Sequence, residues 1–402
     1  MQDQELSIDE LIAKQKPGFA LEQRFYTDPL IYALEQERVL ARNWILAGHQ
    51  SELPEPGDFK VFNLANESAI VVRGGGGELK AFANVCRHRG SLVCLESQGH
   101  ADKFTCPYHG WTYGIDGDLI AARSTASDFD SSEYSLNKIA LEEIGGLIFL
   151  CFSDNPPSVA SARRDMADAI GMFDFENLKV AACKEYDIPA NWKLAIENYE
   201  ECYHCASAHP EYAVMHTLMV DQRRRGHLQK NMIARIESCG LKNIEIDKLD
   251  GRAPPGEMGY SYSRTALFEG YKTGSKEGLP VAPLLGELTD YDGGASDFAF
   301  GQFSFLLVYS DHAVVYVFFP VDHENCRCVV YWMVRGDAEE GKDYDVDKLT
   351  WLWEVTTHAD KEIVVNNWKG IQSSYYKPGP FSEQESAERS WVEWLLSELA
   401  RP

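Results

Sequence analysis

Two short stretches of the chain, Cys86-Arg87-His88-Arg89-Gly90 and Cys106-Pro107-Tyr108-His109-Gly110-Trp111, each contain one cysteine and one histidine ligand candidate. The first pair has the spacing C-x-H and the second C-x-x-H. Two thiolates and two imidazoles this close in sequence are a typical ligand set for a metal centre. The sequence therefore predicts a centre at the tips of two neighbouring loops, each of which supplies one sulfur and one nitrogen ligand.

The spacing separates two kinds of centre. A structural zinc usually takes like ligands in pairs, as C-x₂₋₄-C and H-x₃₋₅-H, whereas here each pair is mixed. In a Rieske [2Fe–2S] cluster the cysteines bind one iron and the histidines bind the other. We therefore predict a Rieske [2Fe–2S] cluster held by Cys86, His88, Cys106 and His109. A closed, tetrahedral structural zinc site is the alternative.

The composition limits the class of protein. The 402 residues are enough for two domains, and 45% hydrophobic residues is ordinary for a globular protein. The net charge of −24 repels nucleic acid and anionic membrane surfaces. No apolar run approaches the ~20 residues that a membrane helix needs. We therefore expect neither nucleic acid nor a membrane as a partner.

The N-terminus and the other cysteines bear on location. Met1-Gln-Asp-Gln-Glu-Leu is acidic and polar, unlike a signal peptide. The cysteines outside the two loops are scattered and form no framework of the secreted type: Cys94, Cys151, Cys183, Cys202, Cys205, Cys239, Cys326 and Cys328. Reduced cysteines and a cytoplasmic location are the simpler expectation.

The residue pattern divides the chain into three parts. Residues 1–44 read as a helical segment, in which Asp28-Pro29 is a typical helix start. Residues 45–155 contain short strand patterns separated by turns such as Gly74-Gly-Gly-Gly, and they predict a small all-β domain. Asp154-Asn-Pro-Pro is the expected boundary before a second domain, residues 156–402.

The second domain mixes strands and helices. Strand patterns at 301–309, 313–320 and 327–334 follow one another with short links, which favours an antiparallel meander. Residues 344–373 and 380–399 are expected to be helical, and 254–294 to be rich in loops. The whole chain is therefore predicted to have an α+β fold.

A second metal site is indicated between residues 191 and 210. His204 and His209 are five residues apart, which places them ~140° apart on a regular helix. They converge only if the helix ends between them, as Pro210 suggests. Two histidines and a carboxylate with open positions form the facial triad of non-haem Fe(II) oxygenases. A mononuclear iron would also accept the electron that a Rieske cluster passes on.

The carboxylate of this triad has three candidates. Glu201 is three residues before His204 and would share a helix face with it, which also suits a role in supporting that histidine. In that case a carboxylate from a distant element is needed. Asp360, on the late helix, is our choice, and Glu362 is the nearest rival. Helical geometry alone does not separate these two.

With both sites, the chain resembles the large subunit of Rieske non-haem iron oxygenases over nearly its whole length. Within that family it is most similar to the branch acting on quaternary amines, which includes the glycine betaine, choline and carnitine monooxygenases and proline betaine demethylase. The stretches that carry this are Phe25-Tyr-Thr-Asp-Pro, Glu197-Asn-Tyr-Glu-Glu-Cys-Tyr-His-Cys, and Thr356 through Asp360 to Tyr376-Lys-Pro-Gly-Pro-Phe-Ser and Glu385. One departure is Trp368, where the branch usually has Gln.

The resemblance implies a structure and a set of partners. It implies an N-terminal Rieske domain and a C-terminal helix-grip catalytic domain, on which we expect the first 44 residues to pack. It implies iron bound by His204, His209 and Asp360, a homotrimer, and an NAD(P)H-dependent reductase as electron donor. It also implies that Glu201 bridges His204 to His109 or His88 of the next subunit, as the path of electron transfer.

The resemblance also implies a reaction: O₂-dependent hydroxylation of a methyl group beside nitrogen, followed by release of formaldehyde. An aromatic-ring dihydroxylating enzyme of the same family and a ferredoxin-type electron carrier are the competing hypotheses. Aromatic faces would recognise a quaternary ammonium. The candidates, none of which the sequence singles out, are Tyr203, Tyr212, Phe303, Phe305, Tyr309, Tyr316, Phe318 and Trp332.

Overall fold

A computed structural model describes residues 7–123, 125–217, 220, 222–241, 254 and 256–401. The chain forms two compact units. One consists of residues 46–156, and the other joins residues 1–45 to residues 157–402. None of the helices among the described residues is both long enough and apolar enough to span a membrane.

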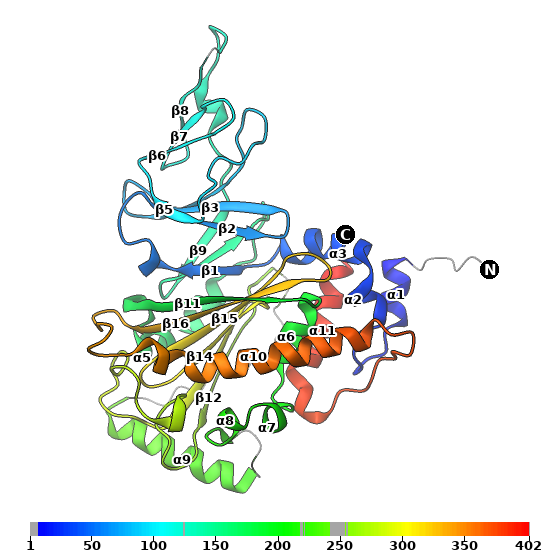
Figure 1. Ribbon diagram of the computed structural model, residues 1–402, viewed down its shortest axis with the longest axis vertical. Helices are drawn as coiled ribbons and strands as arrows, with labels where there is room; N and C mark the ends of the chain where they lie inside the picture. The colour runs from blue at the N-terminus through cyan, green and yellow to red at the C-terminus, as the bar shows by residue number, and fades with distance from the viewer. Residues whose placement is uncertain are drawn as a thin grey trace, which may run out of the picture. The chain divides into compact units, whose positions relative to one another are not determined.

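The 46–156 unit consists of small antiparallel sheets (Figure 1). One sheet has the order β4-β3-β2-β5, from Leu79–Ala83, Glu67–Arg73, Asp58–Leu64 and Gln98–His100. A second, β6-β7-β8, is formed by Lys103–Thr105, Thr112–Gly114 and Leu119–Ala121. The third, β1-β10-β9, is formed by Ile45–His49, Leu147–Cys151 and Ala140–Ile144. The glycine run joins β3 to β4, where Gly77 has a positive φ of 90° that a residue with a side chain rarely adopts.

The other unit is organised on one antiparallel sheet of six strands, in the order β11-β16-β15-β14-β13-β12. The strands are Leu178–Ile188, Cys326–Arg335, Ala313–Pro320, Ser304–Val308, Gly294–Phe300 and Tyr260–Ala266. The prediction of three strands was incomplete. β12 lies inside the stretch expected to be rich in loops, because its alternation of Tyr with Ser gives only a weak apolar signal. The strand expected from residue 301 begins at Ser304.

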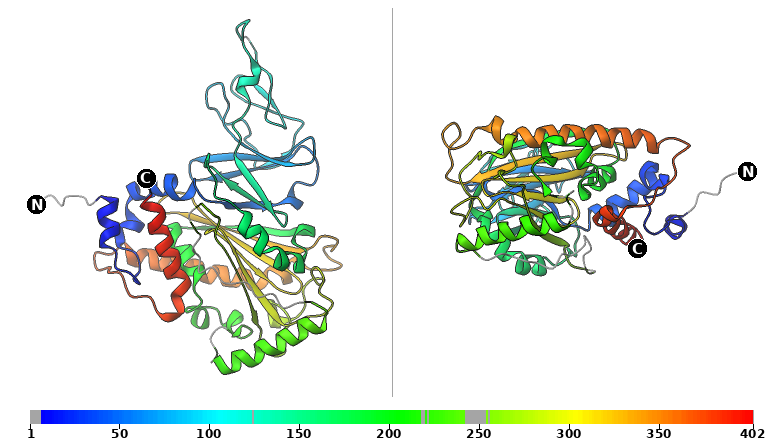
Figure 2. Two further views of the ribbon diagram at one scale, coloured as in Figure 1. Left: turned by 180° about the vertical axis from the view of Figure 1, so that it is seen from behind. Right: turned by 90° about the horizontal axis from the view of Figure 1, so that it is seen from below.

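Helix α10, Val346–Ile371, lies across one face of this sheet (Figures 1 and 2). Asp345 caps its first turn by accepting a hydrogen bond from the amide of Lys348. Tyr316 on β15 and Thr357 on α10 are hydrogen-bonded at 3.1 Å. Helix α11, Ser386–Leu399, starts later than the predicted residue 380, after the 3₁₀ turn Glu383–Glu385. The remaining helices of this part are α4 Ala160–Asp165, α5 Ala167–Phe173, α6 Trp192–Glu200, α7 Cys205–Ala208, α8 Pro210–Ala213 and α9 Gln222–Ser238.

The N-terminal helices are α1 Ile8–Lys14, α2 Gln23–Thr27 and α3 Pro29–Glu35, followed by a π-helical turn, Gln36–Leu40. Asp28 caps α3 and Pro29 occupies its first turn, as predicted. Glu35 pairs with Lys193 of α6 at 2.7 Å, and both side chains are fully buried. The hydroxyl of Tyr26, on α2, donates a hydrogen bond to Glu197 of α6 at 3.0 Å. These contacts fix α6, the helix that leads directly to Glu201.

Candidate metal centres and the adjoining cavity

The two cysteine–histidine loops have the same backbone design. The amide of Gly90 donates to the carbonyl of Cys86 at 2.9 Å, and the amide of Gly110 donates to that of Cys106 at 3.0 Å. Both glycines have positive φ, 74° and 72°, a region that strongly favours glycine. The amide of each cysteine also donates a hydrogen bond of 2.8 Å to the backbone carbonyl of the residue five positions later. Two copies of one turn therefore present the four predicted ligands.

The depth of the four side chains suits a cluster with one inner and one outer iron. Cys86 and Cys106 are buried, whereas His88 and His109 are exposed, with ring centroids 4.6 Å apart. The hydroxyl oxygen of Tyr113 lies 3.4 Å from the sulfur of Cys86. Because the tyrosine oxygen accepts the amide of Arg87, its O–H is available to the sulfur, and hydrogen bonds of this kind tune cluster potentials.

The spacing of the donor atoms argues against zinc. Cys86, His88, Cys106 and His109 are all described, yet no three of their donor atoms form a group in which every pair lies within 4.8 Å. Zinc bonds of about 2.0–2.3 Å in a tetrahedron require all four donors to lie closer than that. Two irons, each with two protein ligands, do not require it.

The one such group among the described residues is His204, His209 and Asp360, the same three residues that the sequence predicts as ligands. Oδ1 of Asp360 lies 3.3 Å from Nε2 of His204 and 2.7 Å from Nε2 of His209. Glu362, the rival carboxylate, is exposed and outside this group. Trp368 lies further along α10 and is not among the residues lining the cavity next to the triad.

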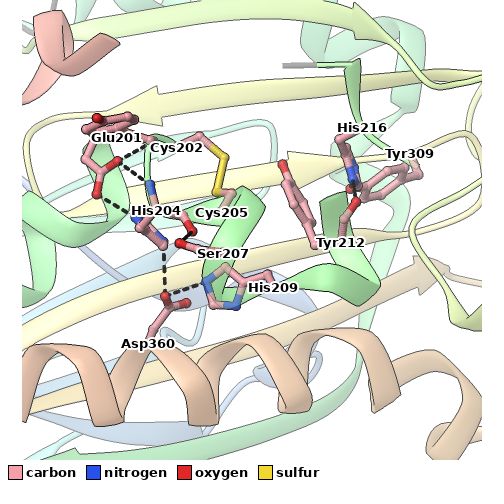
Figure 3. Close-up of a disulfide and its surroundings, with 11 residues drawn as sticks. Glu201, Cys202, His204, Cys205, Ser207, His209, Tyr212, His216, Tyr309 and Asp360 are labelled. Carbon is pink, nitrogen blue, oxygen red and sulfur yellow. Dashed lines mark hydrogen bonds and ion pairs between the residues drawn. A yellow bond between two sulfur atoms is a disulfide. The ribbon is translucent and has the colours of Figure 1, made fainter. Parts of the chain in front are cut away.

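Glu201 sits outside the triad, on the other side of His204 (Figure 3). Its Oε1 lies 2.5 Å from Nδ1 of His204, which leaves Nε2 facing Asp360. The expectation that Glu201 and His204 share a helix face was wrong. Helix α6 ends at Glu200, and Glu201 is extended. Oε2 of Glu201 instead accepts the amides of Tyr203 and His204, so a turn brings the two side chains together.

The helix expected to end between the two histidines, α6, already ends at Glu200, before both of them, and a separate short helix lies between the histidines. His204 and His209 flank α7, which has four residues. Pro210 then starts α8. The chain changes direction after His209, and both rings point toward Asp360 (Figure 3).

The charges of the triad suit a cation. Burial alone lowers the pKa of His204, but its hydrogen bonds to Asp360 and Glu201 raise that pKa to about 9. Burial raises the pKa of Asp360, but the two histidines together bring it below its usual value. Nδ1 of His209 is buried and has no hydrogen-bond partner among the described residues. The negative charge around His204 that favours a bound proton would equally favour a metal cation in its place, and two imidazole nitrogens with a carboxylate are a ligand set that fits a divalent iron.

A cavity of about 930 Å³ adjoins the triad. Of the eight aromatic candidates, four line it: Tyr203, Tyr212, Phe305 and Tyr316. Phe303, Tyr309, Phe318 and Trp332 do not. Four other aromatic residues that the sequence did not single out also line it: Tyr199, Tyr260, Phe298 and Trp353. Trp353 is seven residues before Asp360 on α10, a helical spacing that could have identified it.

Tyr212 is held in the cavity wall by a buried histidine (Figure 3). Its ring stacks on His216 with centroids 3.6 Å apart. Burial lowers the pKa of His216 to about 4, so this ring is neutral at pH 7. Nδ1 of His216 donates to the carbonyl of Tyr212, and Nε2 accepts the hydroxyl of Tyr309 at 2.7 Å. These two hydrogen bonds fix the orientation of the His216 ring, on which the Tyr212 ring stacks.

The cavity is acidic. Its described lining includes Glu200, Glu201, Asp297, Asp360 and Glu383, against Arg225 as the single arginine or lysine. Asp297 is on β13, and its charge adds to burial in raising the pKa of Tyr199 and Tyr212 well above the usual value. Neither Asp297 nor Arg225 carries a local sequence signal. Only the fold brings them to the cavity.

Two protein-family models match the chain. The model described as the Rieske [2Fe-2S] domain matches residues 43–139, and that of the ring hydroxylating alpha subunit (catalytic domain) matches residues 175–400. The chain belongs to the family of ring-hydroxylating alpha subunits, the Rieske oxygenases. It is an oxidoreductase subunit whose cofactors are a [2Fe–2S] cluster and a mononuclear iron.

Two curated relatives match nearly the full length. The glycine betaine monooxygenase oxygenase subunit of Chromohalobacter salexigens is 32% identical over 97% of this chain and 89% of its own. The carnitine monooxygenase oxygenase subunit of Escherichia coli K12 is 30% identical over 91% of this chain and 87% of its own. The chain therefore resembles the quaternary-amine branch of the family.

Solved structures agree on the fold. A quaternary ammonium Rieske monooxygenase, described in connection with carnitine oxidation by gut microbiota, has a TM-score of 0.71 and 25% identity, covering 98% of both chains. Naphthalene 1,2-dioxygenase from Rhodococcus has the same fold at 17% identity and a TM-score of 0.66. The predicted α+β fold is confirmed, and the catalytic domain rules out a pure electron carrier.

Proposed function

We propose that this chain is the oxygenase component of a monooxygenase that hydroxylates and N-demethylates a small quaternary amine or betaine. The cavity carries the proposal, because the triad stands in its wall beside aromatic faces and an excess of carboxylates. A quaternary ammonium has no N–H group, so aromatic faces and negative charge are the means to bind it. Relatives named for glycine betaine and carnitine support the same substrate class.

We assign each cofactor to the residues that fit it. Cys86, His88, Cys106 and His109 would hold the [2Fe–2S] cluster, and His204, His209 and Asp360 the iron. When bound, these groups supply one-electron transfer and the activation of O₂. Glu201 fixes the tautomer of His204, so that Nε2 is the nitrogen offered to the metal.

The residues of the cavity position the substrate. Tyr199 stacks on Phe305 with ring centroids 4.5 Å apart. The ring centroid of Trp353 lies 6.0 Å from that of Tyr212 and 6.3 Å from that of Tyr316. These faces can enclose a trimethylammonium group and exclude water beside the triad. One methyl C–H bond becomes C–OH. The C–N bond then breaks, giving a tertiary amine, formaldehyde and a proton.

Arg225 favours a substrate that also carries a carboxylate. Its Nη2 is 3.5 Å from the carbonyl of Val220, and both residues line the cavity. Guanidinium groups pair strongly with carboxylates. Together with the acidic, aromatic wall, Arg225 suits a zwitterion better than a simple cation.

The remaining parts of the proposal follow from the family. An NAD(P)H-dependent reductase supplies electrons, O₂ is the second substrate, and the assembly is a cytoplasmic homotrimer. Glu201 connects His204 to His109 or His88 of a neighbouring subunit. Support comes from its contact with His204 and from a solved relative described as showing inter-subunit electron transfer.

The test is a screen of small betaines with a reductase, measuring NADH oxidation, O₂ uptake and formaldehyde. A matched neutral analogue, with tert-butyl in place of trimethylammonium, is the control. We expect equimolar formaldehyde with one betaine and no turnover of its neutral analogue. Formation of a cis-diol from an aromatic hydrocarbon, with no formaldehyde from any amine, would instead identify a ring dioxygenase.

A further inference from the structure

A disulfide joins Cys202 to Cys205, inside the segment that carries His204 (Figure 3). The sequence had indicated reduced cysteines, and the structure corrects this for the pair. The Cα atoms are 5.0 Å apart, and the bridge encloses only Tyr203 and His204. Both cysteines line the cavity. The other cysteines of the described residues, Cys183 among them, form no disulfide.

The bridge adds a covalent constraint to a short segment that is otherwise held by hydrogen bonds, among them those from the amides of Tyr203 and His204 to Glu201. Helix α7 has four residues, too few to be stable alone. The turn before it is closed by a long hydrogen bond, 3.3 Å, from the amide of Cys205 to the carbonyl of Cys202. The carbonyl of Cys205 in turn accepts the amide of His209 at 3.0 Å. The disulfide therefore connects the turn of His204 to the backbone of His209.

Of the two bridged cysteines, only Cys202 is partly exposed, which gives a reductant a route to the bridge. Cys202 is partly exposed and its neighbour Tyr203 is 54% exposed, whereas Cys205 is buried. A thiol can attack the sulfur of Cys202 and displace Cys205. Disulfides in reducing compartments are usually transient, redox-sensing or catalytic, and the cytoplasmic location proposed above puts this bridge in that class.

We propose that Cys202 and Cys205 form a reversible redox site that controls how firmly His204, and with it the iron, is held. This rests on the proposed iron ligands. A cellular dithiol breaks the S–S bond through a mixed disulfide and is itself oxidised to a disulfide, while two electrons and two protons convert Cys202 and Cys205 to thiols. The disulfide form holds the iron tightly, and the dithiol form holds it loosely.

The test compares the intact protein before and after treatment with dithiothreitol. Alkylation and mass spectrometry count the thiols at both cysteines, hydrogen exchange follows residues 201–209, and titration of Fe(II) into protein stripped of mononuclear iron gives the affinity. We expect reduction to increase exchange in this segment and to weaken Fe(II) binding about 10-fold, as for loss of groups that support a ligand.

The double variant Cys202→Ser/Cys205→Ser should bind Fe(II) like the reduced protein and no longer respond to dithiothreitol. Cys183→Ser is the control and should behave like the wild type. Equal Fe(II) affinity and equal hydrogen exchange in the oxidised and reduced wild type would overturn the redox site but not the iron site. Finding Cys202 and Cys205 still as thiols after air oxidation would do the same. Failure of either form to bind Fe(II) would overturn the iron site itself and the redox control with it.

Discussion

The two candidate metal centres of this chain are built in opposite ways. In the 46–156 unit, the four proposed ligands come from two loops that repeat one hydrogen-bonding pattern. In the other unit, two of the proposed ligands flank a four-residue helix, and the third lies 151 positions after His209 on α10. The first centre depends on local backbone geometry and the second on the packing of distant elements. Damage to one is therefore expected to spare the other.

The largest effect tests this independence from the side of the cluster. Cys106→Ser should remove the [2Fe–2S] cluster and abolish turnover while mononuclear iron is retained. Wild-type protein should be brown, with about two acid-labile sulfides per chain. Visible spectra and sulfide analysis provide the measurement, and Cys94→Ser, outside the loops, is the control. A colourless wild type containing zinc would contradict the assignment.

The reciprocal change is Asp360→Ala. It should abolish turnover by removing the mononuclear iron, because two histidines alone hold Fe(II) weakly, and it should leave the cluster spectrum intact. Metal analysis and visible spectroscopy distinguish the two centres. Glu362→Ala, on the same helix but exposed, is the control. If Glu362→Ala lost the iron and Asp360→Ala kept it, the third ligand would be misassigned.

A smaller effect is expected at Glu201, through which we propose that electrons pass between the two centres. Glu201→Gln keeps the shape of the side chain but removes the charge next to Nδ1 of His204. Turnover should fall about 10- to 100-fold, the range for groups supporting a ligand. Iron content, cluster content and cluster reduction should be normal, and single-turnover reoxidation of the cluster should slow in step. Loss of iron, or unchanged turnover, would remove the bridge.

Substrate recognition belongs only to the second centre. Arg225→Gln should lower kcat/KM for a betaine about 10-fold, since a charge-assisted hydrogen bond is lost, and leave a quaternary amine without a carboxylate unaffected. Arg224→Gln is the matched control, because Arg224 is exposed, packs over Phe268 and is not in the cavity lining. An equal loss with both substrates would show that Arg225 does not read the carboxylate.

The smallest effect concerns the acidic surroundings of the second centre. Burial raises the pKa of Glu388 from 4.5 to about 10, and the charges of nearby glutamates add to it. The folded protein thus keeps a proton that the unfolded chain releases. The protonation of Glu388 therefore contributes fully to the free energy of unfolding below pH 4.5, and this contribution is lost as pH rises toward 10.

Glu388→Gln should therefore raise Tm at pH 8 by about 2–4 °C and change it less at pH 5, as measured by calorimetry. Glu383→Gln, an exposed glutamate before the same helix, should change Tm little at either pH. A decrease in Tm at pH 8 would show that Glu388 is ionised in the fold.

The sequence by itself determined the features that depend on neighbouring residues. The Cys-x-His and Cys-x-x-His loops, the Asp28-Pro29 helix start and the all-β character of residues 45–155 follow from spacing, capping and turn chemistry. His204 and His209 were found because they flank a helix end marked by Pro210. The net charge of −24 gave no hint that the cavity would be acidic at Asp297.

Only the tertiary structure decided the features that join distant residues. It separated Asp360 from Glu362, brought Tyr199, Trp353 and Arg225 into one cavity, and showed that a turn rather than a helix joins Glu201 to His204. Local periodicity places a side chain on a face of its own element but does not say which element that face meets. The partners are set by packing across the sheet and α10, between residues far apart in the chain.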